Sequence, residues 1–93
     1  KDVVIDLKEH SVTKGGKKVS LKPMEYELLV TLAGSKNVAF SREELLNRIW
    51  GCDYMGETRT VDVHIGQLRK KLDFHDVIRT ISKTGYRLED LEE

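Results

Sequence analysis

The sequence lacks the features that mark secreted, membrane-spanning or disulfide-bonded proteins. Its single cysteine, Cys52, excludes an intramolecular disulfide and agrees with the reducing cytoplasm. No apolar run is long enough to cross a membrane, and no signal-peptide pattern opens the chain. The 93 residues begin with Lys1 and not with methionine. We therefore expect one cytoplasmic domain that is a piece of a longer protein.

The motifs of catalytic and metal sites are also missing. The candidate reactive side chains are Cys52 and the histidines His10, His64 and His75, which are scattered along the chain. They show no Cys/His metal spacing, and the sequence has no nucleophile elbow or phosphate-binding loop. We therefore expect no enzymatic activity, no metal and no cofactor.

The charge is balanced overall but unevenly placed. Charged residues make up 34% of the chain and cancel to zero. Residues 1–57 are balanced, residues 58–88 hold seven cations against three carboxylates, and residues 89–93 hold four carboxylates. A basic segment beside an acidic terminus is typical of a surface that binds a polyanion. An ordinary solvated surface is the alternative, and charge alone does not exclude it.

The N-terminal part is predicted to form a small antiparallel sheet. Val3, Ile5 and Leu7 alternate with polar neighbours, as in a half-buried strand. A second strand is expected near Ser11–Lys14, and Gly15-Gly16 then gives a tight turn into a third strand over Lys17–Leu21.

Three helices are predicted to follow. The first begins at Pro23 and ends near Gly34, although Lys22 is a poor N-cap. The second has a capping box of Ser41 and Glu44 and a hydrophobic staple of Phe40 and Leu45. It ends at Gly51, and residues 51–57 are expected to form a loop. The third helix is expected over about residues 58–72, beginning at Thr58 or its neighbour.

A hairpin is predicted at the C-terminal end. Residues 77–82 are apolar and β-branched, residues 83–85 turn the chain, and residues 86–88 return. The hairpin carries the cations Arg79, Lys83 and Arg87, which can reach a sugar-phosphate backbone or a minor groove. The alternative is an edge hairpin whose charges prevent aggregation. The predicted fold class is α+β, with a sheet, three helices and a hairpin.

The third helix carries the predicted binding surface. At 100° per residue, Val61, Ile65, Leu68 and Leu72 form a narrow buried stripe. The opposite face presents cations that neutralise phosphates. It also presents Gln67, whose amide matches an adenine edge, and Val63, which can pack on a thymine methyl group. A merely solvated polar face remains the alternative on this pattern alone.

Motifs along nearly the whole chain resemble the DNA-binding domain of OmpR/PhoB-type response regulators. The sequences RTVDVHI at residues 59–65 and LRKKL at residues 68–72 are similar to the recognition helix of that family. The sequences IRTI at residues 78–81 and TGYR at residues 84–87 are similar to its wing. PMEYELL at residues 23–29, REELL at residues 42–46 and IWG at residues 49–51 match its first two helices.

The resemblance implies a winged helix-turn-helix over residues 1–93, the effector domain of a two-component transcription regulator. A phosphorylated receiver domain, absent here, would drive dimerisation, and a sensor histidine kinase would phosphorylate it. Paired effector domains would bind direct repeats in double-stranded promoter DNA. The recognition helix, about residues 58–72, would enter the major groove, and the wing, about residues 77–88, would contact the adjacent backbone or minor groove.

The resemblance also implies roles for individual residues. Val63 and Gln67 would face bases, and Tyr54 and Met55 in the loop would contact RNA polymerase. We expect His64 to donate from its neutral ring to phosphate while its other nitrogen is bonded locally. The residues expected at the DNA backbone are Trp50, Arg59, Thr60, His64, Arg69, Lys70, Thr80, Lys83 and Tyr86.

The sequence departs from the family pattern at three places. Many members carry cations where Gly66 and Gln67 stand, so we expect weaker phosphate binding and a base preference shifted away from guanine. Many also carry Arg-Gly where this chain has Ser82-Lys83, and lysine favours phosphate over the groove floor. A winged helix that binds a protein and has little DNA specificity is the alternative. It would require an apolar patch on the third helix, where only Val63 stands out.

Overall fold

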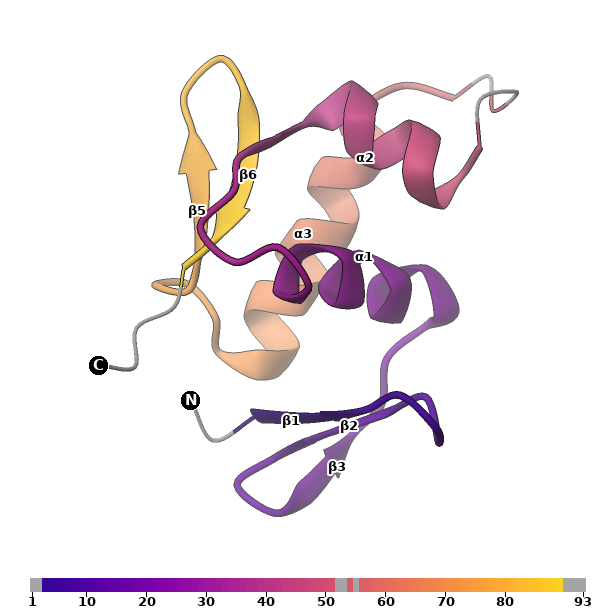
Figure 1. Ribbon diagram of the computed structural model, residues 1–93, viewed down its shortest axis with the longest axis vertical. Helices are drawn as coiled ribbons and strands as arrows, with labels where there is room; N and C mark the ends of the chain where they lie inside the picture. The colour runs from indigo at the N-terminus through magenta and orange to yellow at the C-terminus, as the bar shows by residue number, and fades with distance from the viewer. Residues whose placement is uncertain (1–2, 52–53, 55, 90–93) are drawn as a thin grey trace.

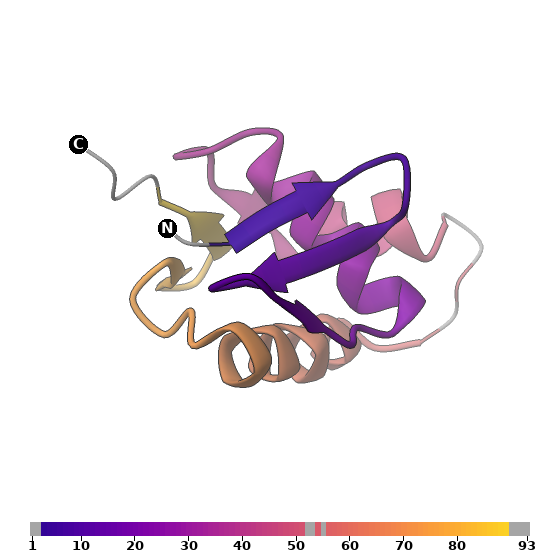
Figure 2. The same cartoon turned by 90° about the horizontal axis from the view of Figure 1, so that it is seen from below.

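The computed structural model describes residues 3–51, 54 and 56–89. Three strands are followed by a helix, a two-residue strand, two further helices and two final strands. The N-terminal sheet lies below the helices and the C-terminal hairpin lies beside them (Figure 1). Viewed from below, the N-terminal sheet lies across the helical layer, with the last helix running along its flank (Figure 2). The expected α+β class, with a winged-helix arrangement, is confirmed.

The N-terminal sheet has the order β1-β2-β3 and is antiparallel, as predicted. Strand β1 (Val3–Asp6) pairs with β2 (Ser11–Lys14), which pairs with β3 (Lys17–Val19). The turn between β2 and β3 uses positive φ angles at Gly15 and Gly16, a conformation that glycine adopts without steric cost.

The predicted first strand is too long by one residue, because Leu7 lies outside β1 and is 64% exposed. The Asp6 carboxylate accepts hydrogen bonds from the backbone N–H groups of Lys8 and Glu9. These bonds turn the chain locally and end the strand before Leu7. The third strand is also shorter than expected and ends at Val19, two residues before Leu21.

Helix α1 (Pro23–Ala33) begins and ends as the sequence predicts. Pro23 is its first residue, and Gly34 caps its C-terminus through an N–H bond to the Val30 carbonyl. Lys22 offers no side-chain acceptor, but its own N–H donates to the Glu25 carboxylate at 2.9 Å. This is one of the two bonds of a capping box, the one between the N3 side chain and the N-cap backbone. It holds the first turn although Lys22 is not a conventional N-cap.

Glu25 also joins α1 to α3 (Arg59–Leu72), because its carboxylate lies 2.7 Å from Lys71 Nζ. The glutamate is only 2% exposed. Burial by itself would raise the pKa of Glu25, but the hydrogen bonds from Lys71 and the Lys22 N–H outweigh it and lower the pKa. The Glu25 carboxylate is therefore charged, and it depends on Lys71 to balance that charge in the core.

Helix α2 (Arg42–Ile49) begins with both bonds of the predicted capping box. Glu44 N–H donates to Ser41 Oγ, and Ser41 N–H donates to the Glu44 carboxylate. Phe40 and Leu45, the predicted staple, are both buried. Helix α3 starts one residue after Thr58, which has helical backbone angles and makes no side-chain cap. It ends where Asp73 turns into the left-handed region with φ of 56°.

A second sheet, of order β4-β6-β5, was not predicted in full. The hairpin of β5 (Ile78–Ile81) and β6 (Gly85–Leu88) is joined by β4 (Phe40–Ser41), which pairs with β6. A Cβ atom on Gly85 would overlap the carbonyl oxygen of Phe40, so glycine lets the two strands meet. The predicted turn over residues 83–85 is accordingly shifted to residues 82–84.

The core lies between the helices and the two sheets. The predicted stripe of α3, namely Val61, Ile65, Leu68 and Leu72, is fully buried. Within the described residues, no helix is long and apolar enough to cross a membrane. The fully buried side chains that complete the core come from every layer: Val12, Leu28, Leu29, Leu32, Leu45 and Ile78.

Replacing Lys71 with methionine is expected to lower the free energy of unfolding by about 3 kcal/mol, because a buried carboxylate loses its partner. The matched control is the double substitution Glu25→Gln and Lys71→Met, which removes the charge as well and should recover much of the loss. Urea unfolding followed by circular dichroism measures both. Equal destabilisation of the single and double variants would contradict the pairing argument.

Candidate nucleic-acid interface

The outward face of α3 is exposed where the sequence predicts it. Val63 is 57% exposed, and Arg59, Gln67 and Lys70 are also exposed. Thr60 is half-buried at the edge of this face. The face therefore presents a methyl-bearing side chain and an amide between cations, on a helix whose other side is fixed in the core.

Asp62, on the first turn of α3, connects this helix to the hairpin and to α2. Its Oδ1 accepts from the Tyr86 hydroxyl at 2.5 Å and from Arg42 Nε at 2.7 Å. Burial tends to raise the pKa of Asp62, but the bonds from Tyr86 and Arg42 lower it overall. Burial and then the bond to Asp62 raise the pKa of Tyr86, so the phenol stays a donor.

Arg69 makes the second connection between α3 and the hairpin. Its Nε and Nη2 donate to the carbonyl of Ile78, and Nη2 also donates to Thr80 Oγ1 at 2.8 Å. The guanidinium groups of Arg69 and Arg42 lie 5.5 and 5.4 Å from the centroid of the Tyr86 ring, within cation–π range. Tyr86 is thus held between two arginines and is only 4% exposed.

The tip of the hairpin carries an exposed lysine. The Thr84 N–H donates to the Ile81 carbonyl, which closes a turn over residues 81–84. Lys83 takes the left-handed position of that turn with φ of 64° and is exposed. A side chain in this region is disfavoured relative to glycine, so the tip holds a cation at some conformational cost.

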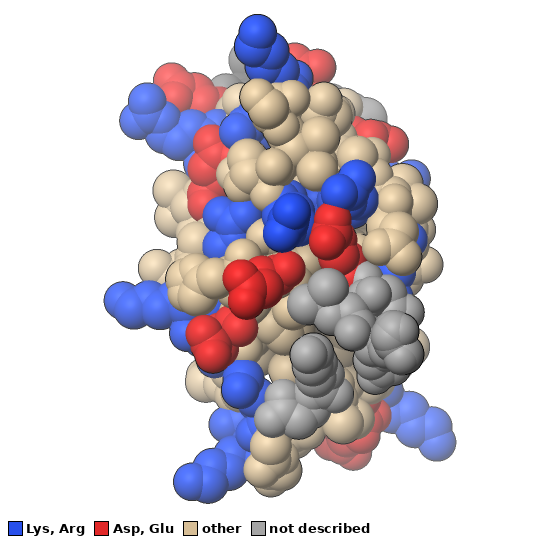
Figure 3. All heavy atoms as spheres, turned by 90° about the vertical axis from the view of Figure 1, so that its left-hand side faces the viewer, with Lys and Arg blue, Asp and Glu red and all other residues tan. Residues whose placement is uncertain are grey.

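The other two cations of the hairpin are balanced by a carboxylate. Arg79 and Arg87 are direct cross-strand partners, an arrangement that is unfavourable for like charges. Glu89 bonds to Arg87 through Nε and Nη2, and it lies 3.9 Å from Arg79 Nε. The face on the hairpin side accordingly shows carboxylates among the cations (Figure 3).

Trp50 and His64 lie together beside the outward face of α3. Their ring centroids are 5.0 Å apart in an edge-to-face arrangement. His64 Nδ1 lies 2.8 Å from the Thr60 carbonyl oxygen. A carbonyl oxygen only accepts, so Nδ1 carries the proton, and Nε2 of the neutral ring holds a lone pair. The local bond expected for His64 is therefore present. Because Nδ1 is the donor in that bond, a neutral His64 has no second N–H to donate to a phosphate, contrary to the expectation from the sequence.

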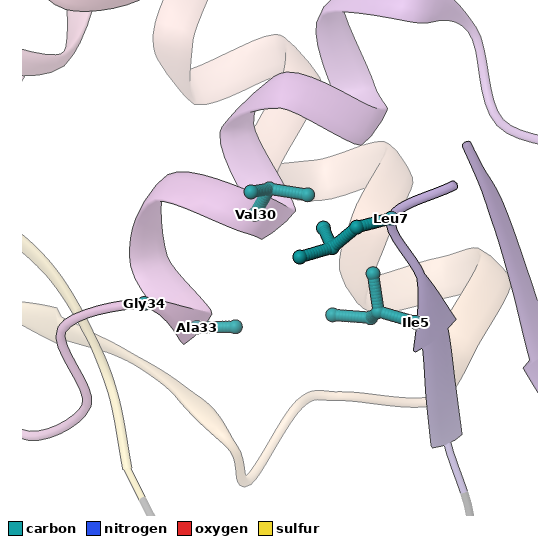
Figure 4. A pocket seen from close by; sticks show the side chains of 5 residues that line it. All are labelled: Ile5, Leu7, Val30, Ala33 and Gly34. Atoms are coloured by element: carbon teal, nitrogen blue, oxygen red, sulfur yellow. The ribbon is translucent and has the colours of Figure 1, made fainter. Parts of the chain in front are cut away.

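A pocket elsewhere in the described residues has a different character. A pocket of about 210 Å³ lies between β1 and the end of α1, where Ile5 and Leu7 face Val30 and Ala33 (Figure 4). Its lining is apolar and holds no titratable group. In residues 3–51, 54 and 56–89, no three His, Cys, Asp or Glu residues form a metal-binding group.

Comparison with known proteins agrees with this geometry. Residues 16–88 match the family described as "Transcriptional regulatory protein, C terminal". The chain belongs to this family. It is a DNA-binding domain of the OmpR/PhoB type of response regulator. This domain is 45% identical over 91 residues to the phosphate regulon transcriptional regulatory protein PhoB of Rhizobium meliloti, covering 95% of this chain and 40% of that protein.

Solved structures of DNA-binding domains show the same fold. The DNA-binding domain of Bacillus subtilis CssR has a TM-score of 0.87 and 31% identity, covering 92% of this chain and 98% of that one. The Klebsiella pneumoniae RstA DNA-binding domain, solved in complex with the RstA box, has a TM-score of 0.85 and 32% identity. That match covers 96% of this chain and 92% of the RstA chain. The chain spans about two fifths of the length of the curated relatives it matches.

The response-regulator domain uses some of the expected phosphate-binding residues internally. Arg69, Thr80 and Tyr86 bind one another or Asp62 in the free domain, so their direct contact with DNA stays a prediction. Arg42 and Asp62 were missed as members of the site, since a lone arginine and aspartate on helices give no signal of a pair 20 residues apart. Tyr54 is 39% exposed, and Met55 lies outside the described residues.

Replacing Tyr86 with phenylalanine is expected to destabilise the domain by about 1.5 to 3 kcal/mol, because the Asp62 carboxylate loses a hydrogen bond. Amide exchange in residues 78–88 should accelerate, since this bond helps to hold the hairpin on α3. Tyr26→Phe is the matched control, because Tyr26 is equally buried and its hydroxyl makes only a 3.5 Å bond to the Asp6 carbonyl. Equal loss in both variants, measured by urea unfolding, would show that the Asp62 bond is unimportant.

Proposed function

We propose that this domain binds double-stranded promoter DNA sequence-specifically, with α3 in the major groove and the hairpin as a wing on the adjacent backbone or minor groove. The observation that carries the proposal is the exposed face of α3, where Val63 and Gln67 lie between Arg59 and Lys70. Val63 and Gln67 have the chemistry to meet a thymine methyl group and an adenine edge. The flanking cations have the chemistry to meet phosphates.

The phosphate contacts divide into two groups in this proposal. Arg59, Thr60, Lys70 and Lys83 contact the backbone directly, and Trp50 packs beside it. Arg69 donates to the wing through Nε and Nη2, which leaves Nη1 to donate to a phosphate. Tyr86 and Thr80 set the position of the wing relative to α3. They contact DNA only at the periphery of the interface.

The larger regulatory role is also a proposal. A receiver domain in the longer protein, phosphorylated by a sensor kinase, would pair two effector domains on direct repeats. The loop that contains Tyr54 and Met55 would contact RNA polymerase. Support comes from the kind of relatives that the chain matches, several of which are response regulators by name, such as the DNA-binding response regulator MtrA of Mycobacterium tuberculosis. The RstA domain is bound to its own DNA box.

Selection of bound duplexes from a random DNA pool tests the proposed function. Enrichment of a short asymmetric motif, repeated about one helical turn apart, is the result expected of domains that sit side by side. No enrichment by the isolated domain, or by two domains joined through a flexible linker, would overturn sequence-specific binding. The linked pair supplies the proximity that a receiver would otherwise provide.

Gln67→Ala is expected to relax preference at one base pair of the selected motif, with little change in binding to unrelated duplexes. Lys70→Ala, one helical turn away on the same face, is expected to weaken binding to all duplexes alike and to reduce the salt dependence by about one phosphate contact. Fluorescence anisotropy at several salt concentrations separates the two effects. Indistinguishable behaviour of the two variants would contradict the division between base and phosphate contacts.

A further inference from the structure

Gly66 is a glycine for which the free domain gives no internal reason. It lies in the middle of α3, is exposed, and has none of the positive φ angles that require glycine. A Cβ atom built on it would meet no heavy atom within 4 Å. Gly85 is the opposite case, since a Cβ atom there would overlap the Phe40 carbonyl. Steric crowding inside the domain therefore accounts for the glycine at position 85 but not for the glycine at position 66.

The glycine also weakens the helix that carries the proposed contacts. Glycine loses more backbone freedom on folding than alanine does, so it is a poor residue for a helix interior. At the exposed position of Gly66, alanine would fit without any rearrangement. A residue that costs stability and relieves no internal crowding is best explained by something that approaches the helix from outside.

The position of Gly66 on α3 indicates what approaches the helix there. At 100° per residue, Gly66 falls between the outward pole of α3, near Val63 and Lys70, and the side that carries Asp62 and Arg69. Asp62 and Arg69 are bonded to the hairpin. Gly66 therefore lies on the flank of α3 that is turned toward the wing, and Figure 1 shows the two elements side by side.

A sugar-phosphate strand separates the major groove from the minor groove. If α3 occupies the first and the wing the second or its rim, that strand must pass between them. We propose that Gly66 is the point of closest approach between the α3 backbone and this strand. The missing side chain sets how deeply α3 enters the groove, and so which base edges Val63 and Gln67 reach. This inference rests on the proposed function and names a residue that determines its specificity.

The test compares Gly66→Ala and Gly66→Gln with the unmodified domain, using the duplex selected above. Both residues are better helix formers than glycine, so the melting temperature should rise by a few degrees. DNA affinity should fall by about fivefold or more for alanine, and further for glutamine, because each added atom keeps α3 away from the strand. Repeating the duplex selection with Gly66→Ala should also yield an altered motif.

Asn47→Ala is the matched control. Asn47 is an exposed, poor helix former in α2, so its replacement should raise the melting temperature while DNA affinity stays unchanged. Gly66 variants that melt higher and bind as tightly as the unmodified domain would overturn the inference, as would variants that melt lower, since these would reveal an internal need for glycine. Failure of the unmodified domain to select any motif would instead overturn the proposed function.

Discussion

The arrangement of the binding surface depends on one carboxylate. The Asp62 carboxylate accepts hydrogen bonds from the Tyr86 hydroxyl and from Arg42 Nε. It thereby joins α3, the wing and the start of α2. Without a charged acceptor at this place, Tyr86 would be a buried phenol without its partner, between two arginines. A wing held in this way has a fixed offset from α3, which is what the proposed contact with two neighbouring grooves of DNA requires.

Local signals in the sequence predict much of this fold, because they act over a few residues. The Ser41–Glu44 capping box sets the start of α2. The buried stripe of α3 follows from its periodicity, and the outward position of Val63 and Gln67 follows with it. The error at Leu7 is also local, since the side chain of Asp6 competes with strand pairing in a way that alternation does not reveal.

The rest could not be predicted because it joins distant parts of the chain. The pairing of β4 with β6 brings Phe40 against Gly85, and the salt bridge of Lys71 to Glu25 spans 46 residues. Arg69 is a cation on a basic helix, and nothing in its neighbours shows that it bonds to the Ile78 carbonyl. Composition gives the number of cations, whereas only the tertiary structure shows which of them already have a partner.

The wing is held against the domain along its strands, up to the residue that borders its turn. Gly85 packs on Phe40, Tyr86 bonds to Asp62, and Arg69 reaches no farther than Thr80. The turn of residues 82–84 lies beyond these contacts, and its three residues are exposed. A change in the length or charge of this turn leaves the contacts beneath it in place, so the reach of the wing can change while the outward face of α3 stays the same.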